Sequence, residues 1–336
     1  MIDPATIPDS GAAFPGMTLA DAARALLERQ KEEWALCRKG YATLSTVRSR
    51  TFDFDGFIIK AQFNPGRLTS SAAKVDEKSI RERPCFLCAK NLPPDQRGFR
   101  VEGEYLFLCN PFPIFPEHFT IPHLDHRPQR IIPSLTSFLT LARDLSPGYL
   151  VAYNGPRCGA SAPDHMHLQA GVRGFIPFER ELSELGPTRQ ETLRARGDLS
   201  VFSLSRYLRS LIVLQSGSRS MLEGGFQDIY ETCAEVLQEV DEEPMMNLLS
   251  WHEDGVWTLA MFARSKHRPS FFYEEGERKI LLSPAAVDMG GVCTLPLEQD
   301  LHKISREQVM QIFTEISLDE EVFRRLKSEI TRRMGR

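Results

Sequence analysis

The chain has 336 residues and a formal charge of −4, with 42% hydrophobic and 26% charged residues. This length allows one large domain or two of ordinary size, and the composition is that of a soluble globular protein. The charge argues against a general nucleic-acid or membrane surface, and no apolar run approaches the ~20 residues that span a bilayer. The N-terminal segment lacks the basic start and apolar core of a signal peptide, so a cytoplasmic protein is expected.

The first half of the chain predicts a mixture of helices and strands. Residues 1–16 are rich in Pro, Ala and Gly and are expected to be a loosely ordered lead-in. Apolar spacing predicts a helix over 18–38, and alternation predicts a hairpin whose strands, 47–54 and 56–63, meet at Asp55-Gly56. The other elements expected here are strands over 105–109, 118–122, 150–154 and 165–169 and a helix over 132–145.

The second half predicts the same kinds of element. They are a charged segment over 179–196, strands over 211–215, 245–251 and 256–262, extended segments over 278–282 and 292–295, and helices over 221–240, 305–315 and 319–334. Antiparallel strands with helices in both halves predict an α+β fold with two similar units. We divide the chain into a lead-in (1–16), a first half (17–174) and a second half (175–336), although no sequence repeat establishes a duplication.

The stretch from His165 to Gln169 is the best candidate for a reactive site. Side chains alternate along a strand, so His165, His167 and Gln169 are expected on one face and the apolar residues between them on the other. A loop with Gly159 and Ser161 precedes this strand, and Asn154 ends the strand before it. Two imidazoles and an amide beside polar turns indicate a histidine nucleophile that attacks phosphorus, although a chance pair of histidines on a strand is the simpler alternative.

Cys85 and Cys88 form the one close pair among seven cysteines, an odd number that argues against a disulfide framework in a chain of this size. Two thiolates at this spacing can bind one tetrahedral zinc ion together with two further ligands. The candidates for those ligands are His118, His123, His126 and His165. A redox pair and two reduced buried cysteines are the alternative interpretations.

Phosphoryl-type transfer requires positive charge and fixed donors around the phosphate oxygens. The first half offers Arg67, Lys74 and Ser161, with Asn154 and the backbone N–H groups from Gly159 onward. The second half offers a basic cluster, Lys266-His267-Arg268. Ordinary solvated loops are the alternative explanation for the charged residues.

The segment His165-Met166-His167-Leu168-Gln169 resembles the His-x-His-x-Gln signature of the nucleotidyltransferase branch of the histidine-triad superfamily. That branch includes galactose-1-phosphate uridylyltransferases, diadenosine tetraphosphate phosphorylases and GDP-hexose phosphorylases, and the similarity to the last group is strongest. Further segments that carry the resemblance are 61–67, 116–122 with 128–131, and 153–155. The second half resembles the branch only in general character and lacks a second His-x-His.

The resemblance implies a fold and a mechanism. The fold would be a histidine-triad-like antiparallel sheet with flanking helices, made of two similar halves packed together. His167 corresponds to the family nucleophile, which forms a covalent nucleotidyl-histidine. Gln169 corresponds to the residue that hydrogen-bonds a phosphate oxygen, and it separates the transferases from relatives with a third histidine, which are mainly hydrolases. Members of the branch are often dimers, so a homodimer is an expected assembly.

The resemblance also sharpens the zinc prediction. Zinc-bearing relatives use a Cys-x-x-Cys, a histidine on the strand before the central helix, and the first histidine of the signature. Carried onto this chain, the ligands are Cys85, Cys88, His118 and His165, a structural site without an open position. His123 and His126 stay as alternative ligands. GDP-hexose phosphorylases are not characteristically zinc proteins, so the chain combines features of two branches.

These features together predict a nucleotidyltransferase or phosphorylase that acts on a nucleotide sugar or a dinucleoside polyphosphate. Inorganic phosphate or a sugar phosphate would accept the nucleotidyl group from His167, which acts with Gln169 and Ser161. Arg67, Lys74, Asn154 and Gly159 would bind the substrate. The alternatives are a hydrolase of the same superfamily and a catalytically silent, zinc-stabilised nucleotide-binding protein.

Overall fold

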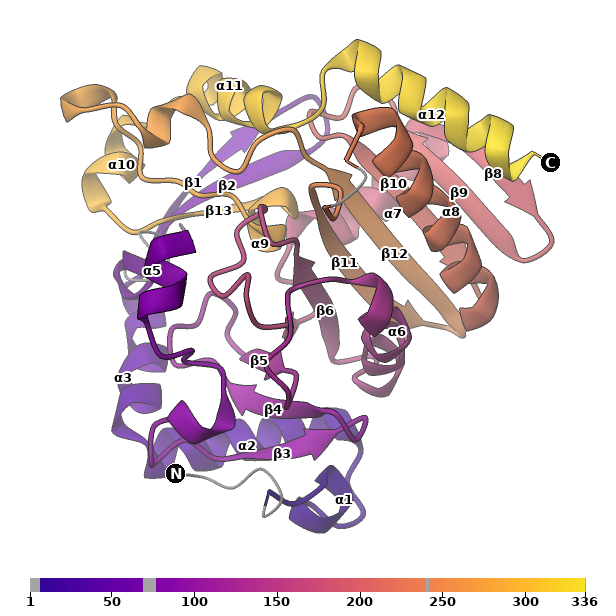
Figure 1. Ribbon diagram of the computed structural model, residues 1–336. Coiled ribbons are helices and arrows are strands. Elements are labelled where there is room, and N and C mark those ends of the chain that lie inside the picture. The colour runs from indigo at the N-terminus through magenta and orange to yellow at the C-terminus, as the bar shows by residue number, and fades with distance from the viewer. Residues whose placement is uncertain (1–6, 69–76, 240–241, 336) are drawn as a thin grey trace.

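The computed structural model describes residues 7–68, 77–239 and 242–335. Its central feature is a ten-stranded antiparallel sheet with the strand order β3-β4-β5-β7-β6-β11-β12-β10-β9-β8 (Figure 1). The strands are β3 (Gly98–Val101), β4 (Tyr105–Cys109), β5 (His118–Pro122), β6 (Tyr149–Asn154), β7 (His167–Val172), β8 (Gln190–Arg196), β9 (Leu199–Leu204), β10 (Leu211–Ser216), β11 (Met246–Glu253) and β12 (Val256–Ala263).

The two halves of the chain build the two halves of this sheet with the same topology. In each half three consecutive strands form a meander, and the fifth strand lies between the third and the fourth. The two fourth strands, β6 and β11, pair across the middle, with Asn154 opposite Asn247. The predicted α+β fold of two similar halves is therefore confirmed. The strand equivalent to β7 is β12, which contains no histidine.

Both halves of the chain contribute helices, and some of these helices cover one face of the large sheet. The helices are α1 (Ser10–Ala13), α2 (Leu19–Glu33), α3 (Ala35–Thr43), α5 (Glu77–Glu82), α6 (Leu135–Asp144), α7 (Pro177–Arg189), α8 (Arg219–Leu237), α9 (Ala286–Met289), α10 (Glu298–Lys303), α11 (Arg306–Ile316) and α12 (Glu320–Met334). α2, α6, α8 and α12 share one apolar core with the large sheet, to which β7 contributes Leu168 and Ala170, and the turn before β7 contributes Met166. No helix in the described part of the chain is both long enough and apolar enough to cross a membrane.

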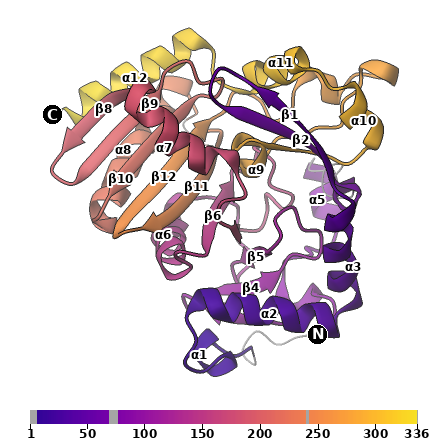
Figure 2. The same ribbon diagram turned by 180° about the vertical axis from the view of Figure 1, so that it is seen from behind.

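A small sheet and several helices pack against the opposite face. Its strands are β1 (Arg48–Asp53), β2 (Ile58–Phe63) and β13 (Val292–Leu295), in the order β1-β2-β13. β13 comes from the second half and runs parallel to β2 of the first half. Figure 2 shows the β1–β2 hairpin beside α9, α10 and α11. This pairing brings residues from both ends of the chain to one place on the sheet.

Local sequence signals explain many element boundaries. The Thr18 hydroxyl accepts a hydrogen bond from the Asp21 amide at the start of α2, and Ser218 caps α8 in the same way. The predicted hairpin turn is confirmed at Asp55-Gly56, where both residues have positive φ, as a two-residue turn requires. The helix predicted over 18–38 is interrupted at Trp34, whose extended backbone divides it into α2 and α3.

Other segments have a structure that the sequence left open or placed differently. The charged segment over 179–196 is not uniform, because α7 ends at Arg189 and β8 follows directly. β9 was not predicted, and the segment 278–282 forms no regular strand. The strand predicted from His165 begins at His167, because the amide of His165 donates to the Ala162 carbonyl in a turn.

Glu243 of the second half forms buried hydrogen bonds with two residues of the first half. Its carboxylate accepts hydrogen bonds from the Tyr153 hydroxyl and from the Ile131 amide, and only 2% of the residue is exposed. Burial raises the pKa of the Glu243 carboxyl to about 7, against the opposing effects of these two hydrogen bonds and of Arg130.

This pKa predicts a stability that depends on pH. The folded chain keeps the Glu243 proton to a higher pH than the unfolded chain does. The contribution of this group to the free energy of unfolding is therefore fully present below about pH 4.5 and is lost as the pH rises through about 7. The loss amounts to about 3 kcal/mol. Urea unfolding of wild type and Glu243→Gln between pH 5 and pH 9 measures it. We expect the wild type to lose stability relative to the variant over this range, and parallel curves would contradict the assignment.

Candidate active site

The end of β7 that carries His167 lies where two strands of the large sheet separate. β6 and β7 pair from Tyr149↔Val172 to Ala152↔Gln169. Beyond that point the Gln129 side chain bridges the gap. Its amide nitrogen donates to the carbonyls of Asn154 and His167, each at 2.9 Å, and its oxygen accepts from the His167 amide at 2.7 Å. Gln129 thus holds the backbone of His167 on the side where β6 has separated, and β5 lies on the other side, with Pro122 opposite His167.

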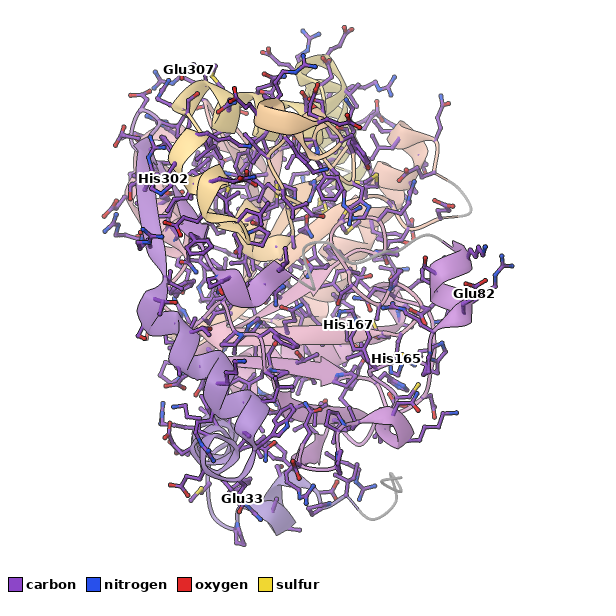
Figure 3. All side chains as sticks on the ribbon, turned by 90° about the vertical axis from the view of Figure 1, so that its left-hand side faces the viewer. Glu33, Glu82, His165, His167, His302 and Glu307 are labelled. Carbon is purple, nitrogen blue, oxygen red and sulfur yellow. The ribbon has the colours of Figure 1, made fainter. Side chains whose placement is uncertain are left out.

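The imidazole of His167 is oriented by the residue two positions before it. His165 and His167 are labelled in Figure 3. His167 Nδ1 lies 2.8 Å from the His165 carbonyl oxygen, which can only accept, so Nδ1 carries the proton. Burial lowers the pKa of His167 to about 4, so the ring is neutral near pH 7. Nε2 therefore keeps its lone pair, and no described residue forms a hydrogen bond with it. A neutral imidazole fixed in this tautomer is a suitable nucleophile.

An apolar cavity of about 360 Å³ lies beside His167. It is bounded by segments before α3, between α5 and β3, and after β4. Its apolar lining consists of Trp34, Leu36, Phe86, Leu87, Leu92, Pro93, Leu108, Pro111 and Phe112. A cavity of this size and character can hold a planar ring system.

A smaller polar cavity of about 50 Å³ adjoins the apolar one. Arg67, Ser161 and Gln169 line both cavities. The residues that line only the polar cavity come from both halves of the chain and are Ile114, Asn154, Gly159, Ala160, His267, Arg268, Ser283, Ala285, Val287, Asp288 and Thr294. Two guanidinium groups and several neutral donors in a small polar space are suited to an anionic group.

Asn154 reaches this cavity with its amide fixed in one orientation. Its oxygen accepts hydrogen bonds from the Asn247 side chain at 2.9 Å and from the Ala286 amide at 2.7 Å. Because both partners are donors, the Asn154 NH₂ group must point away from them. Asn154 therefore offers a donor, and not an acceptor, to the cavity that it lines.

The second-half wall of the polar cavity is held by Arg264, which is 1% exposed. Its guanidinium donates to the carbonyls of Lys266, His267 and Pro284 and to the Asn247 side chain. These bonds fix the backbone beside Arg268, whose own Nε donates to Ser283 Oγ at 3.0 Å and whose guanidinium lies over the Phe272 ring.

Asp288 closes the same wall and accepts backbone hydrogen bonds on both carboxylate oxygens. One carboxylate oxygen accepts from the Ala285 amide and the other from the Thr294 amide, each at 2.9 Å. Burial raises the pKa of Asp288 to about 6, while these bonds and the Arg67 charge act in the opposite direction. Gly159 faces this segment with φ +90°, and a Cβ there would lie 2.7 Å from the Ala285 side chain. Glycine is therefore required at position 159.

A separate cluster contains Cys85, Cys88, His126 and His165, whose ligand atoms all lie within 4.8 Å of one another. His165 Nδ1 is 3.3 Å from Cys85 Sγ and 3.5 Å from Cys88 Sγ, and His126 Nδ1 is 3.3 Å from Cys88 Sγ. Ligands around one tetrahedral zinc ion are about 3.6 Å apart when the metal bonds are about 2.1–2.3 Å long. The four residues can therefore hold a metal ion.

The surroundings of both histidines also fit metal binding. His165 Nε2 lies 2.7 Å from the His123 carbonyl, and His126 Nε2 lies 3.5 Å from an Asp164 oxygen. Each ring thus has an acceptor behind it, which leaves Nδ1 deprotonated toward the cluster. Burial and the neighbouring Cys85 thiol raise the pKa of Cys88 to about 11, so a cation is needed to hold Cys88 as a thiolate.

The structure does not bring His118, the predicted ligand, to this cluster, and His126 lies there instead. His118 is on β5, where its Nε2 lies 3.0 Å from Gln169 Oε1 and its Nδ1 accepts from the Ile114 amide. His126 lies in the loop after β5, which turns back toward the cysteines. His123 is also outside the cluster, since its Nδ1 accepts from the Asp125 amide.

The other predicted residues gather around the two cavities. His167, Gln169 and Ser161 line the apolar cavity, and Arg67, Asn154 and Gly159 line the polar one. Lys74 lies outside the described residues. The sequence did not identify Gln129 or Asp288, although Gln129 belongs to a segment that carried the family resemblance.

Two family models match the chain. The GDPGP1-like, C-terminal domain family matches residues 183–336, and a domain of unknown function, DUF4922, matches residues 26–172. No sequence among the curated proteins matches the chain.

Solved structures share the fold at low sequence identity. Yeast Ap4A phosphorylase Apa2 in complex with AMP is 18% identical, with a TM-score of 0.59 over 90% of this chain and 98% of that chain. The same enzyme in complex with Ap4A is 16% identical, with a TM-score of 0.59 over 88% and 97%. A uridylyltransferase structure covers 85% of this chain and 99% of that chain at 11% identity, with a TM-score of 0.41.

Proposed function

We propose, on the premise that this chain has the fold of the histidine-triad nucleotidyltransferases, that it transfers a nucleotidyl group through a covalent intermediate on His167. The substrate would be a nucleotide sugar or a dinucleoside polyphosphate. The carrying observation is the neutral imidazole of His167, whose Nδ1–H donates to the His165 carbonyl while Nε2 stays available at the cavity.

The reaction would proceed in two displacements. His167 Nε2 attacks the α-phosphorus, an N–P bond forms, and the P–O bond to the sugar phosphate or the remaining nucleoside polyphosphate breaks. An oxygen of inorganic phosphate then attacks the same phosphorus, the N–P bond breaks, and a nucleoside diphosphate leaves. A sugar phosphate could act as the acceptor in the same way.

The two cavities would divide the substrate between them. The nucleoside would occupy the apolar cavity, and the phosphate groups would extend past Gln169 and Ser161 into the polar one. Arg67 and Arg268 would balance the negative charge there, and the Asn154 amide would donate to a phosphate oxygen. The neutral side chain of Gln169 avoids repulsion of the anionic substrate.

Zinc would have a structural role. Cys85, Cys88, His126 and His165 would supply four protein ligands, so no position would be open for substrate or water. Because the backbone of His165 orients the imidazole of His167, the metal would also stabilise the nucleophile in its tautomer.

Intact-protein mass spectrometry tests the proposal. The protein is incubated without phosphate with a panel of nucleoside diphosphate sugars and dinucleoside polyphosphates. We expect an adduct of one nucleoside monophosphate that disappears when phosphate is added. An adduct that decays equally fast in water alone would indicate the hydrolase, and nucleotide binding without any adduct would indicate the silent binding protein.

Arg268 provides a test of the contribution from the second half. We expect Arg268→Gln to lower kcat/KM by about 100-fold, because one positive donor to the phosphate groups is lost. Arg278→Gln is the matched control, since its side chain is 80% exposed and pairs with Glu274 outside both cavities. Steady-state kinetics with the donor identified above measure both. Equal activity of the two variants would remove Arg268 from the site.

A further inference from the structure

His118 is completely buried on β5, yet it belongs neither to the metal cluster nor to the apolar core. β5 pairs with β7 so that Thr120 is opposite Gln169 and His118 is opposite Gly171. The His118 ring thus lies beside the Gln169 side chain, and its Nε2 is 3.0 Å from Gln169 Oε1. A buried histidine bonded to a residue of the proposed phosphate site needs a role.

The hydrogen bonds of His118 fix its tautomer. The Ile114 amide donates to Nδ1 at 3.1 Å, and a backbone amide has no alternative to donating. Nδ1 is therefore unprotonated, and Nε2 carries the hydrogen. Burial and the nearby Arg67 charge lower the pKa of His118 to about 3, so the ring remains neutral at physiological pH.

The tautomer of His118 in turn fixes the orientation of Gln169. Because His118 Nε2–H donates, the Gln169 carboxamide must present its oxygen to the ring. Its NH₂ group then points to the opposite side, toward the cavities that Gln169 lines. The reversed amide would bring two donors together and lose the bond. The Asn154 amide has the same orientation, because two donors bond its oxygen. Asn154 and Gln169 therefore both offer NH₂ groups to the polar cavity.

Packing keeps the His118 ring in place. The edge of the Phe115 ring meets it at a centroid distance of 5.2 Å. Phe115 in turn occupies space above Gly171, where a Cβ would come within 2.5 Å of the aromatic ring. The position of the imidazole is therefore determined by contacts that no substrate has to provide.

We propose that His118 is a positioning residue that holds the Gln169 carboxamide with its NH₂ group toward the phosphate, so that Gln169 donates to a non-bridging oxygen during both displacements. The inference rests on the proposed function, because it assigns a direction to the amide in that reaction. Without His118 the Gln169 carboxamide can rotate and turn its oxygen toward the substrate. This oxygen and the anionic phosphate groups then repel each other. We therefore expect loss of His118 to slow the two displacements, because negative charge on the phosphate oxygens must be stabilised in both.

Two replacements of similar shape separate positioning from packing. In His118→Gln the side-chain NH₂ can take the place of Nε2–H and donate to Gln169. In His118→Asn the side-chain oxygen can still accept from the Ile114 amide, but the shorter chain does not reach Gln169. We expect the rate of adduct formation at saturating donor to fall less than about 5-fold in His118→Gln and about 30-fold or more in His118→Asn. The KM should change little in either variant.

A double-mutant cycle with Gln169→Ala tests whether His118 acts through Gln169. We expect His118→Asn to have no further effect on the rate in the Gln169→Ala background. Equal losses in both backgrounds, or equal rates for His118→Gln and His118→Asn, would overturn the inference while the wild-type adduct left the proposed function intact. Long-range ¹H–¹⁵N NMR spectra provide a readout that needs no turnover. They should show the Nε2–H tautomer for His118, and the Nδ1–H tautomer would also overturn the inference.

Discussion

His167→Ala is expected to reduce nucleotidyl transfer by about 10⁴-fold or more and to abolish the covalent adduct. The variant lacks the atom that would form the N–P bond, and the imidazoles of His165 and His118 are engaged elsewhere. His165 faces the cysteines, and His118 has both ring nitrogens in hydrogen bonds. Rapid-quench measurement of the first displacement, with intact mass in parallel, gives the size of the loss.

The fold should survive this substitution. The hydrogen bonds between Gln129 and position 167 involve only the backbone of residue 167, so they remain in the variant. His302→Ala is a suitable control because the His302 side chain is 65% exposed and its partner is Glu298 at the surface. A His167→Ala protein that still formed the adduct at a wild-type rate would exclude His167 as the nucleophile.

The parts of this site that lie on one strand could be predicted from the sequence. Strand periodicity placed His165, His167 and Gln169 on one face and Met166, Leu168 and Ala170 in the core. The structure has this arrangement except for His165, which lies in the turn before β7 and faces the cysteines. These relations depend only on neighbours along the chain, so a single sequence contains them.

The identity of the second metal histidine could not be predicted in the same way. His118 and His126 are eight positions apart, on a strand and in the loop after it. Which of them meets the cysteines depends on the pairing of β5 with β7, which places His118 beside Gln169. Such register is a non-local property.

The residues that the second half adds to the polar cavity could not be predicted, for a similar reason. The cluster Lys266-His267-Arg268 was visible as a basic patch, but nothing nearby in sequence indicated a cavity. It meets Arg67 and Gln169 because β6 pairs with β11 and β13 pairs with β2. No sequence motif pointed to Asp288, since its role is to accept two backbone hydrogen bonds in a turn.

Removal of one metal ligand is expected to have the second large effect. We predict that Cys85→Ser and His126→Ala each reduce bound zinc from one equivalent per chain to near zero. Structural zinc sites contribute about 10–16 kcal/mol of apparent binding free energy in small domains, so a lost site should lower Tm by 5 °C or more. Elemental analysis of the purified protein and thermal unfolding measure the two quantities.

Comparison of His118 with His126 tests the ligand assignment directly. His118→Asn is a matched control for His126→Ala because it lies in the same region of the fold. It should keep a full equivalent of zinc and still slow the chemical step, since His118 bonds Gln169 and not the metal. His126→Ala should have the opposite profile, with zinc lost and the Gln169 contact unchanged. Because the His165 carbonyl accepts the His167 Nδ1 hydrogen, adduct formation should also slow once the metal no longer holds His165. Loss of zinc from His118→Asn, with zinc retained in His126→Ala, would return the metal site to the ligand set that the family resemblance first implied.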